Sequence, residues 1–246
     1  MRYRFVDCRF DLLEPANAEA DYRGGHIPGA RFLDLERDLS DLARAPEAGR
    51  HPLPSAERFA ASASRAGIED GIHVVAYDDG SLAGAARLWW LLRFFGHAQV
   101  SVLAGGVGSW LGELERGASP DDGATFVPRA GRGGTVTASD VGERSRAPGV
   151  VVLDARAPER YRGEHEPLDP VAGHVPGAIN LPSTAAFTPG LPDDALAADE
   201  LIVYCGSGVT ACVVLLALAL AGRPDALLYP GSWSEWSRLG LPVERG

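Results

Sequence analysis

Hydrophobic positions along this chain gather into short continuous runs that are separated by longer mixed segments. One run, 201–204, predicts a buried strand, and the apolar segment 210–221 predicts a buried helix directly after it. A second strand and helix are predicted at 73–77 and 83–95. Short apolar strands that alternate with helical segments are typical of a parallel sheet covered by helices on both faces. We therefore expect an α/β fold.

The predicted elements occur twice in the same order. Both halves contain Asp-x-Arg at the end of a strand, followed by His-x-Pro-Gly-Ala, a strand and helix, and a last strand at 100–103 or 226–229. Only the second half has a lead-in, at 135–141. The segment between the halves is rich in Gly, Pro and Asp. We predict domains at 1–117 and 135–246, joined by a linker at 118–134.

The repeat separates residues that serve the fold from candidates for chemistry. Polar residues present in both halves are predicted to be structural: Asp7 and Asp154, Arg9 and Arg156, His26 and His174. Cys205 has no counterpart, because the matching position in the first half is Asp78. We therefore predict that the second half carries a nucleophile and that the first half is catalytically silent.

Cys205 is predicted to lie where a strand ends and a helix begins. Helix N-termini gather unpaired N–H groups and a partial positive charge, which favour a thiolate over a thiol. Gly206 and Gly208 allow successive N–H groups to point inward and hold an anion. The alternative interpretation is an inert buried cysteine.

Composition excludes several classes of function. The net charge is −10, which argues against a nucleic-acid or membrane-surface partner. All 23 basic residues are arginine, so a lysine Schiff base is excluded. The three cysteines, Cys8, Cys205 and Cys212, form no disulfide framework or metal motif, and a reducing compartment is expected. With no signal-peptide pattern and no apolar stretch that could span a bilayer, we expect a cytoplasmic protein.

The ordered motifs resemble those of the rhodanese superfamily of two-domain sulfurtransferases. The resemblance rests on Asp-x-Arg and His-x-Pro-Gly-Ala in both halves, Cys-Gly-Ser-Gly-Val-Thr-Ala at 205–211 and Gly-Ser-Trp-Ser-Glu-Trp at 231–236. It implies tandem rhodanese-like domains, each a parallel sheet flanked by helices, and a sulfur carried as a persulfide on Cys205. It implies neither a metal nor an organic cofactor. The loop residues implied to bind substrate are Gly206, Gly208, Val209 and Thr210.

The resemblance also bears on the sulfur donor. Members that prefer thiosulfate typically have basic residues after the cysteine, whereas this neutral loop is similar to that of the 3-mercaptopyruvate type. In that type, the position of Arg160 binds the substrate carboxylate. Leu168 stands where a second substrate arginine is expected, and Arg162 is a candidate to compensate for it.

The same family resemblance implies a proton relay in which Ser207 is polarised by His51 and His51 is oriented by Asp34. The expected reaction moves sulfur from 3-mercaptopyruvate through Cys205 to cyanide, a small thiol or reduced thioredoxin.

Three alternatives remain open at this point. A thiosulfate sulfurtransferase would use the same nucleophile, and a non-catalytic sulfur carrier would use the same fold. A phosphatase of this fold needs an arginine where this chain has Ala211. Cys212 is expected in the core, and no role is assigned to Cys8.

Overall fold

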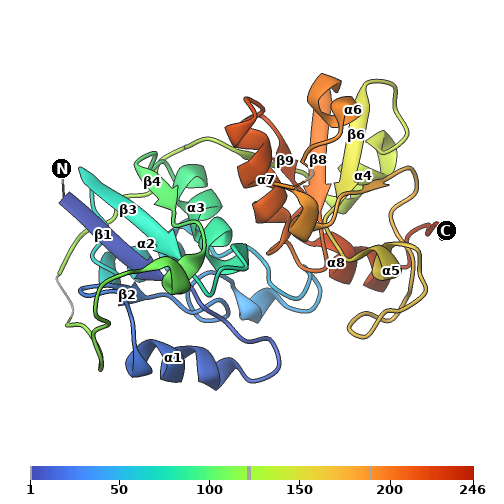
Figure 1. Ribbon diagram of the computed structural model, residues 1–246. Coiled ribbons are helices and arrows are strands. Elements are labelled where there is room, and N and C mark those ends of the chain that lie inside the picture. Colours follow the sequence, from blue (N-terminus) through green and yellow to red (C-terminus); the bar gives the residue numbers. More distant parts are fainter. Residues whose placement is uncertain (1, 121–122, 189) are drawn as a thin grey trace. The chain divides into compact units, whose positions relative to one another are not determined.

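The computed structural model describes residues 2–120, 123–188 and 190–246 (Figure 1). Their contacts divide the chain into two units. The first comprises Met1–Asp41 and Leu53–Arg132, and the second comprises Leu42–Pro52 and Gly133–Gly246.

The first unit contains a four-stranded parallel sheet with the strand order β2-β1-β3-β4 (Figure 1). Its strands are β1 (Arg2–Asp7), β2 (Arg31–Phe32), β3 (Ile72–Tyr77) and β4 (Val100–Val102). Its helices are α1 (Pro15–Gly24), α2 (Ala56–Arg65) and α3 (Ala83–Phe94), with a 3₁₀ turn at Gly106–Ser109. The first ten residues of α3 are buried, because this helix packs against β3 and β4.

The second unit contains a five-stranded parallel sheet with the strand order β5-β9-β8-β6-β7. Its strands are β5 (Gly134–Thr135), β6 (Val150–Asp154), β7 (Ile179–Asn180), β8 (Glu200–Tyr204) and β9 (Leu227–Leu228). Its helices are α4 (Ala138–Arg144), α5 (Pro158–Tyr161), α6 (Asp193–Ala197), α7 (Ala211–Leu220) and α8 (Ser232–Arg238), with 3₁₀ turns at Leu42–Arg44 and Ser183–Ala185. The additional strand, β5, lies where the predicted linker meets the lead-in that the first half lacks. The predicted α/β class, with parallel sheets flanked by helices, is confirmed.

Two segments belong to a different unit from the one that their position in the chain suggests. Residues 42–52 precede β3 of the first unit, yet they belong to the second. A Cβ atom added at Gly49 would lie 2.6 Å from the carbonyl oxygen of Gly231, so this segment runs directly against the start of α8. Residues 118–120 and 123–132, which fall in the predicted linker, belong to the first unit, where Phe126 packs edge-on against Phe59.

The duplicated histidines make the same contacts in each unit. His26 stacks on Tyr22 with 4.1 Å between ring centroids, and its Nδ1 donates to the Tyr22 carbonyl at 2.8 Å. His174 stacks on Tyr161 at 3.8 Å and donates to the Tyr161 carbonyl, also at 2.8 Å. Both imidazoles are buried in these turns. The contacts support the prediction that these histidines serve the fold.

A buried ion pair anchors the end of β6. The Asp154 carboxylate accepts Nε and Nη2 of Arg156 at 3.1 and 2.7 Å, and it accepts the Tyr204 hydroxyl at 2.7 Å. Arg156 also donates to the Gly173 carbonyl at 2.6 Å, and its guanidinium carbon lies 4.5 Å from the centre of the Trp233 ring. Burial alone would lower the pKa of Arg156, but the Asp154 charge outweighs it and raises this pKa above its ordinary value.

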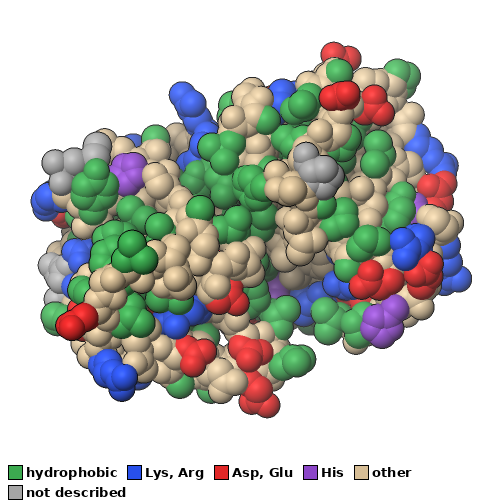
Figure 2. Space-filling model, in the orientation of Figure 1, with side chains coloured by type: hydrophobic (Ala, Val, Ile, Leu, Met, Phe, Trp, Pro, Cys, Tyr) green, Lys and Arg blue, Asp and Glu red, His purple; other side chains and the backbone are tan. Residues whose placement is uncertain are grey.

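The surface carries both signs of charge. On the face that Figure 2 shows, arginine side chains (blue) are interspersed with acidic side chains (red). Within the described part of the chain, no helix has the length and apolar character needed to cross a membrane.

Candidate active site

Cys205 follows β8 and is buried. Its Sγ accepts the N–H of Gly208 at 3.1 Å. The Cys205 N–H donates to Oγ of Ser232 at 3.2 Å, and the Cys205 carbonyl accepts the N–H of Trp233 at 2.9 Å. The loop is therefore held on one side by α8, while a backbone N–H at its base points at the sulfur.

The matching loop of the first unit shows what this backbone arrangement binds. There the carboxylate of Asp78 accepts the N–H groups of Gly80 at 2.9 Å, Leu82 at 3.1 Å and Ala85 at 3.2 Å. Burial nevertheless raises the pKa of Asp78. The first unit thus fills this concavity with the carboxyl group of Asp78, whereas the second unit places a sulfur at the corresponding position.

Gly208 has a φ of +77°, and a Cβ atom added there would lie 2.6 Å from the Pro230 carbonyl oxygen. We expect Gly208→Ala to strain the loop by about 1–2 kcal/mol and to displace the N–H that points at Sγ. Loss of one such donor should lower kcat about 100- to 1,000-fold. Gly222→Ala is the matched control, since φ there is +89° and nothing lies within 4 Å of the added Cβ. If both variants lower sulfur transfer equally, the Gly208 N–H is not a specific contributor.

The structure brings Ser207 and His51 together from positions that are 156 residues apart. Nδ1 of His51 lies 2.8 Å from Oγ of Ser207, and both side chains are buried. Asp34 belongs to the first unit, where its Oδ1 accepts the N–H groups of Glu36 at 2.9 Å and Arg37 at 2.8 Å. The proposed role of Asp34 in orienting His51 stays a prediction.

Arg160 lies beside the cysteine loop within a network of charges. It donates through Nη2 and Nε to Glu166 at 2.7 and 3.1 Å, and through Nη2 to Asp169 at 3.3 Å. Asp169 also accepts Nη1 of Arg50 at 2.8 Å. A Cβ atom added at Gly206 would lie 3.2 Å from Nη2 of Arg50 and 3.3 Å from Nη1 of Arg160. Two guanidinium groups therefore border the residue that follows the cysteine.

Arg50 is the residue that sequence reasoning missed. Its only local signal is that it precedes His51, and nothing in the chain pattern predicts that this segment belongs to the second unit. Arg162, the candidate to compensate for Leu168, instead donates to Glu164 at 2.7 and 2.9 Å and has a side chain that is 43% exposed. The Leu168 side chain is also exposed.

The other candidate residues occupy supporting positions. Val209 is buried and Thr210 directly precedes α7. Cys212 is buried in α7, as expected, and its Sγ donates to the Gly208 carbonyl at 3.4 Å. Cys8 is buried in the first unit, and burial raises the pKa of its thiol. Among the residues that the structure describes, no cluster of His, Cys, Asp or Glu is placed to hold a metal ion.

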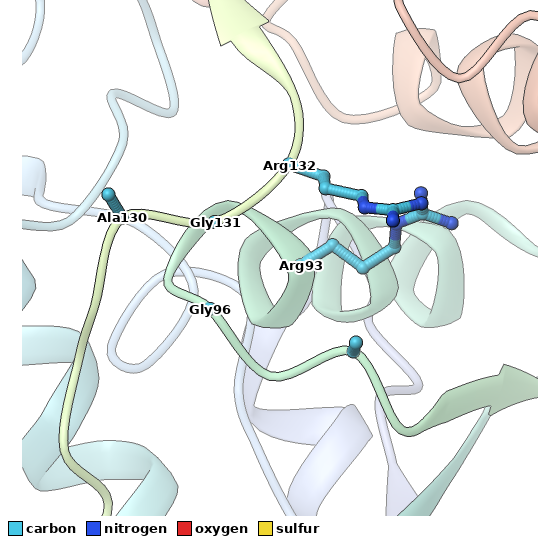
Figure 3. Close-up of a pocket in the computed structure, with 6 residues that line it drawn as sticks. Arg93, Gly96, Ala130, Gly131 and Arg132 are labelled. Carbon is cyan, nitrogen blue, oxygen red and sulfur yellow. The ribbon is translucent and has the colours of Figure 1, made fainter.

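The first unit contains a pocket that none of these candidates lines. Its walls are formed by Arg93, Gly96, Ala98, Ala130, Gly131 and Arg132. Figure 3 shows the side chains of Arg93 and Arg132 lying side by side. Burial and the charge of Arg132 lower the pKa of Arg93. Because its walls contain neither a nucleophile nor a general acid or base, this pocket does not carry the predicted chemistry.

Comparison with known proteins agrees with this fold. The rhodanese-like domain family matches residues 2–113 and 137–239. The chain therefore belongs to the rhodanese-like family. More particularly, it is a two-domain sulfurtransferase of the rhodanese and 3-mercaptopyruvate sulfurtransferase type.

Individual relatives carry two kinds of name. The Mycobacterium tuberculosis protein named "Putative thiosulfate sulfurtransferase SseB" is 46% identical over 267 aligned positions, which cover 98% of this chain and 90% of the relative. The 3-mercaptopyruvate sulfurtransferase of Escherichia coli is 38% identical, covering 94% of this chain and 87% of the relative. The crystal structure of SseA from Escherichia coli matches with a TM-score of 0.80 and 35% identity, covering 94% of this chain and 92% of that one.

Proposed function

We propose that the protein moves sulfur from 3-mercaptopyruvate, through a persulfide on Cys205, to a thiophilic acceptor. The observation that carries this proposal is the 2.8 Å contact between Ser207 and His51. The donor thiol must lose a proton, and the departing pyruvate enolate must gain one. Thiosulfate releases sulfite without any proton transfer. The buried hydroxyl of Ser207, two residues after Cys205, and the imidazole of His51 beside it can carry out the proton transfer that 3-mercaptopyruvate needs and thiosulfate does not.

In the proposed reaction, the Cys205 thiolate attacks the sulfur of 3-mercaptopyruvate. An S–S bond forms, the S–C bond breaks, and its electron pair leaves on the enolate of pyruvate. The proton of the donor thiol passes through Ser207 and His51 to the enolate carbon, so that pyruvate is released. The N–H of Gly208 points at the cysteine sulfur and stabilises the persulfide charge. Cyanide, a small thiol or reduced thioredoxin then takes the outer sulfur and restores the thiolate.

The charges beside the loop also favour a donor with one carboxylate. Arg50 and Arg160 are compensated by two carboxylates, those of Glu166 and Asp169. Such a network presents oriented N–H donors with little surplus positive charge. That suits the monoanionic carboxylate of 3-mercaptopyruvate better than a dianion.

Thiosulfate is the second candidate donor. The relative that is named a thiosulfate sulfurtransferase shares 46% of its aligned residues with this chain. The two guanidinium groups beside Gly206 are also compatible with a sulfur oxyanion.

The donor is tested by initial rates with cyanide as acceptor and each donor in turn. We expect a higher kcat/KM for 3-mercaptopyruvate, and we expect Ser207→Ala to lower it about 100-fold. The same variant should change thiosulfate turnover little, because that reaction needs no proton relay. Ser139→Ala is the matched control, since Ser139 is an exposed residue of α4. A wild-type preference for thiosulfate, or an equal loss with both donors in Ser207→Ala, would contradict the proposal.

A further inference from the structure

We propose that Arg50 is a donor-binding residue: together with Arg160, it forms a two-guanidinium clamp that holds the carboxylate of the sulfur donor beside the Cys205 loop. The identity of the donor as a carboxylate rests on the proposed function. The clamp itself rests on the contacts of Arg50, Arg160 and Asp169.

Both arginines turn one terminal nitrogen toward the same residue. The ion pairs occupy Nη1 of Arg50, and Nε and Nη2 of Arg160. The nitrogens nearest to Gly206 are Nη2 of Arg50 and Nη1 of Arg160, and the ion-paired Nη2 of Arg160 lies slightly farther away. Because Gly206 has no side chain, both guanidinium groups come close to the loop backbone beside Cys205, within 3.2 and 3.3 Å of the position that a Cβ atom would take. Gly206 is bonded directly to the nucleophilic residue, so a carboxylate held there lies close to the reacting sulfur.

Buried Asp169 fixes both arms of the clamp. Its side chain is fully buried, and its two oxygens bind Arg50 at 2.8 Å and Arg160 at 3.3 Å. The side chains of Arg50 and Arg160 stay partly accessible to solvent. Holding both forks in advance reduces the entropy lost when a ligand carboxylate binds between them.

Backbone contacts also fix the position of Arg50. The Arg50 N–H donates to Oγ of Ser234 at 2.9 Å. Gly49 packs against Gly231 so closely that a Cβ atom there would meet the Gly231 carbonyl. Segment 42–52 is therefore anchored on the first turn of α8, whose residues also hold the cysteine loop. This anchoring gives Arg50 a fixed position relative to Gly206.

Arg50 supplies the positive charge that the sequence lacks at Leu168. Arg162 is engaged by Glu164 on the surface, so it does not take this place. A guanidinium from a distant segment thus provides the second arm.

Kinetics on the full-length enzyme test the clamp. We expect Arg50→Gln to raise the KM for 3-mercaptopyruvate about 10- to 100-fold, as expected for a lost charged hydrogen bond. The kcat should change much less, because Arg50 touches the carboxylate and not the reacting sulfur. The inhibition constant of pyruvate, which has the carboxylate but no transferable sulfur, should rise by a similar factor. Arg162→Gln is the matched control and should leave both constants within about twofold of wild type.

Arg50→Lys covers the case in which Arg50→Gln disturbs folding, because it keeps a charge next to Asp169 but removes the planar fork. A raised KM and a raised pyruvate inhibition constant in Arg50→Lys, with an unchanged melting temperature, support the clamp. Unchanged constants in both Arg50 variants, or an equal effect of Arg162→Gln, overturn it.

Failure of the proposed function gives a different result. A wild-type preference for thiosulfate rejects 3-mercaptopyruvate as the donor. Even then, weaker pyruvate inhibition and a raised thiosulfate KM in the Arg50 variants support Arg50 as an anion-binding residue, whereas unchanged values overturn that role.

Discussion

Cys205→Ser is expected to abolish sulfur transfer, lowering kcat/KM on the order of 10⁴-fold or more. A serine hydroxyl neither ionises near neutral pH nor forms a stable bond to the transferred sulfur. Serine is close to cysteine in size and can still accept the N–H of Gly208, so the loop should keep its conformation. The measurements are initial rates with both donors and the protein mass after incubation with donor alone. Wild type should gain the mass of one sulfur atom, and the variant should gain none.

Cys8→Ala is the matched control for the nucleophile. Cys8 is a buried cysteine of the first unit, and its thiol faces the Val6 carbonyl. We expect this variant to form the persulfide and to turn over at a rate close to that of wild type. A sulfur adduct on the Cys205→Ser protein, or loss of turnover in Cys8→Ala, would show that the sulfur is carried elsewhere.

The largest expected effect on stability comes from Arg156→Ala. This change removes the charged partner of the buried Asp154 carboxylate, which typically costs about 3–5 kcal/mol of unfolding free energy. It also removes the bond to the Gly173 carbonyl and the packing over Trp233. Urea unfolding followed by tryptophan fluorescence measures the loss.

The repeat provides the control, Arg9→Ala in the first unit. Arg9 binds Asp7 and the Gly25 carbonyl just as Arg156 binds Asp154 and the Gly173 carbonyl. The Arg9 side chain is 14% exposed, however, against 1% for Arg156. Water can therefore reach the site vacated at Arg9, and we expect a smaller loss, about 1–3 kcal/mol. Equal losses in the two variants would argue that burial does not set the cost.

Local patterns in the chain were sufficient to predict the fold and to single out Cys205 as the candidate nucleophile. The apolar segments at 83–95 and 210–221 correspond to α3 and α7, within a residue at either end. Buried strands and helices can be predicted because each is a continuous run of apolar residues. The glycines after Cys205 predict a turn at the end of the strand. The repeat allowed the two halves of the chain to be compared with each other. This comparison singled out Cys205, because Asp78 occupies the matching position in the first unit. Each of these signals depends on residues that are near one another in the sequence.

Tertiary structure alone decided which distant residues meet. Segment 42–52 has no strong periodicity, and its place against α8 depends on close contacts such as that of Gly49 with Gly231. Those contacts bring Arg50 to Gly206 and His51 to Ser207. A long-range contact depends on the shape of both surfaces and on the path of the chain between them, and no local pattern encodes either. The sequence by itself therefore determined the fold class, the repeat and the cysteine, whereas the folded chain determined which charges surround it.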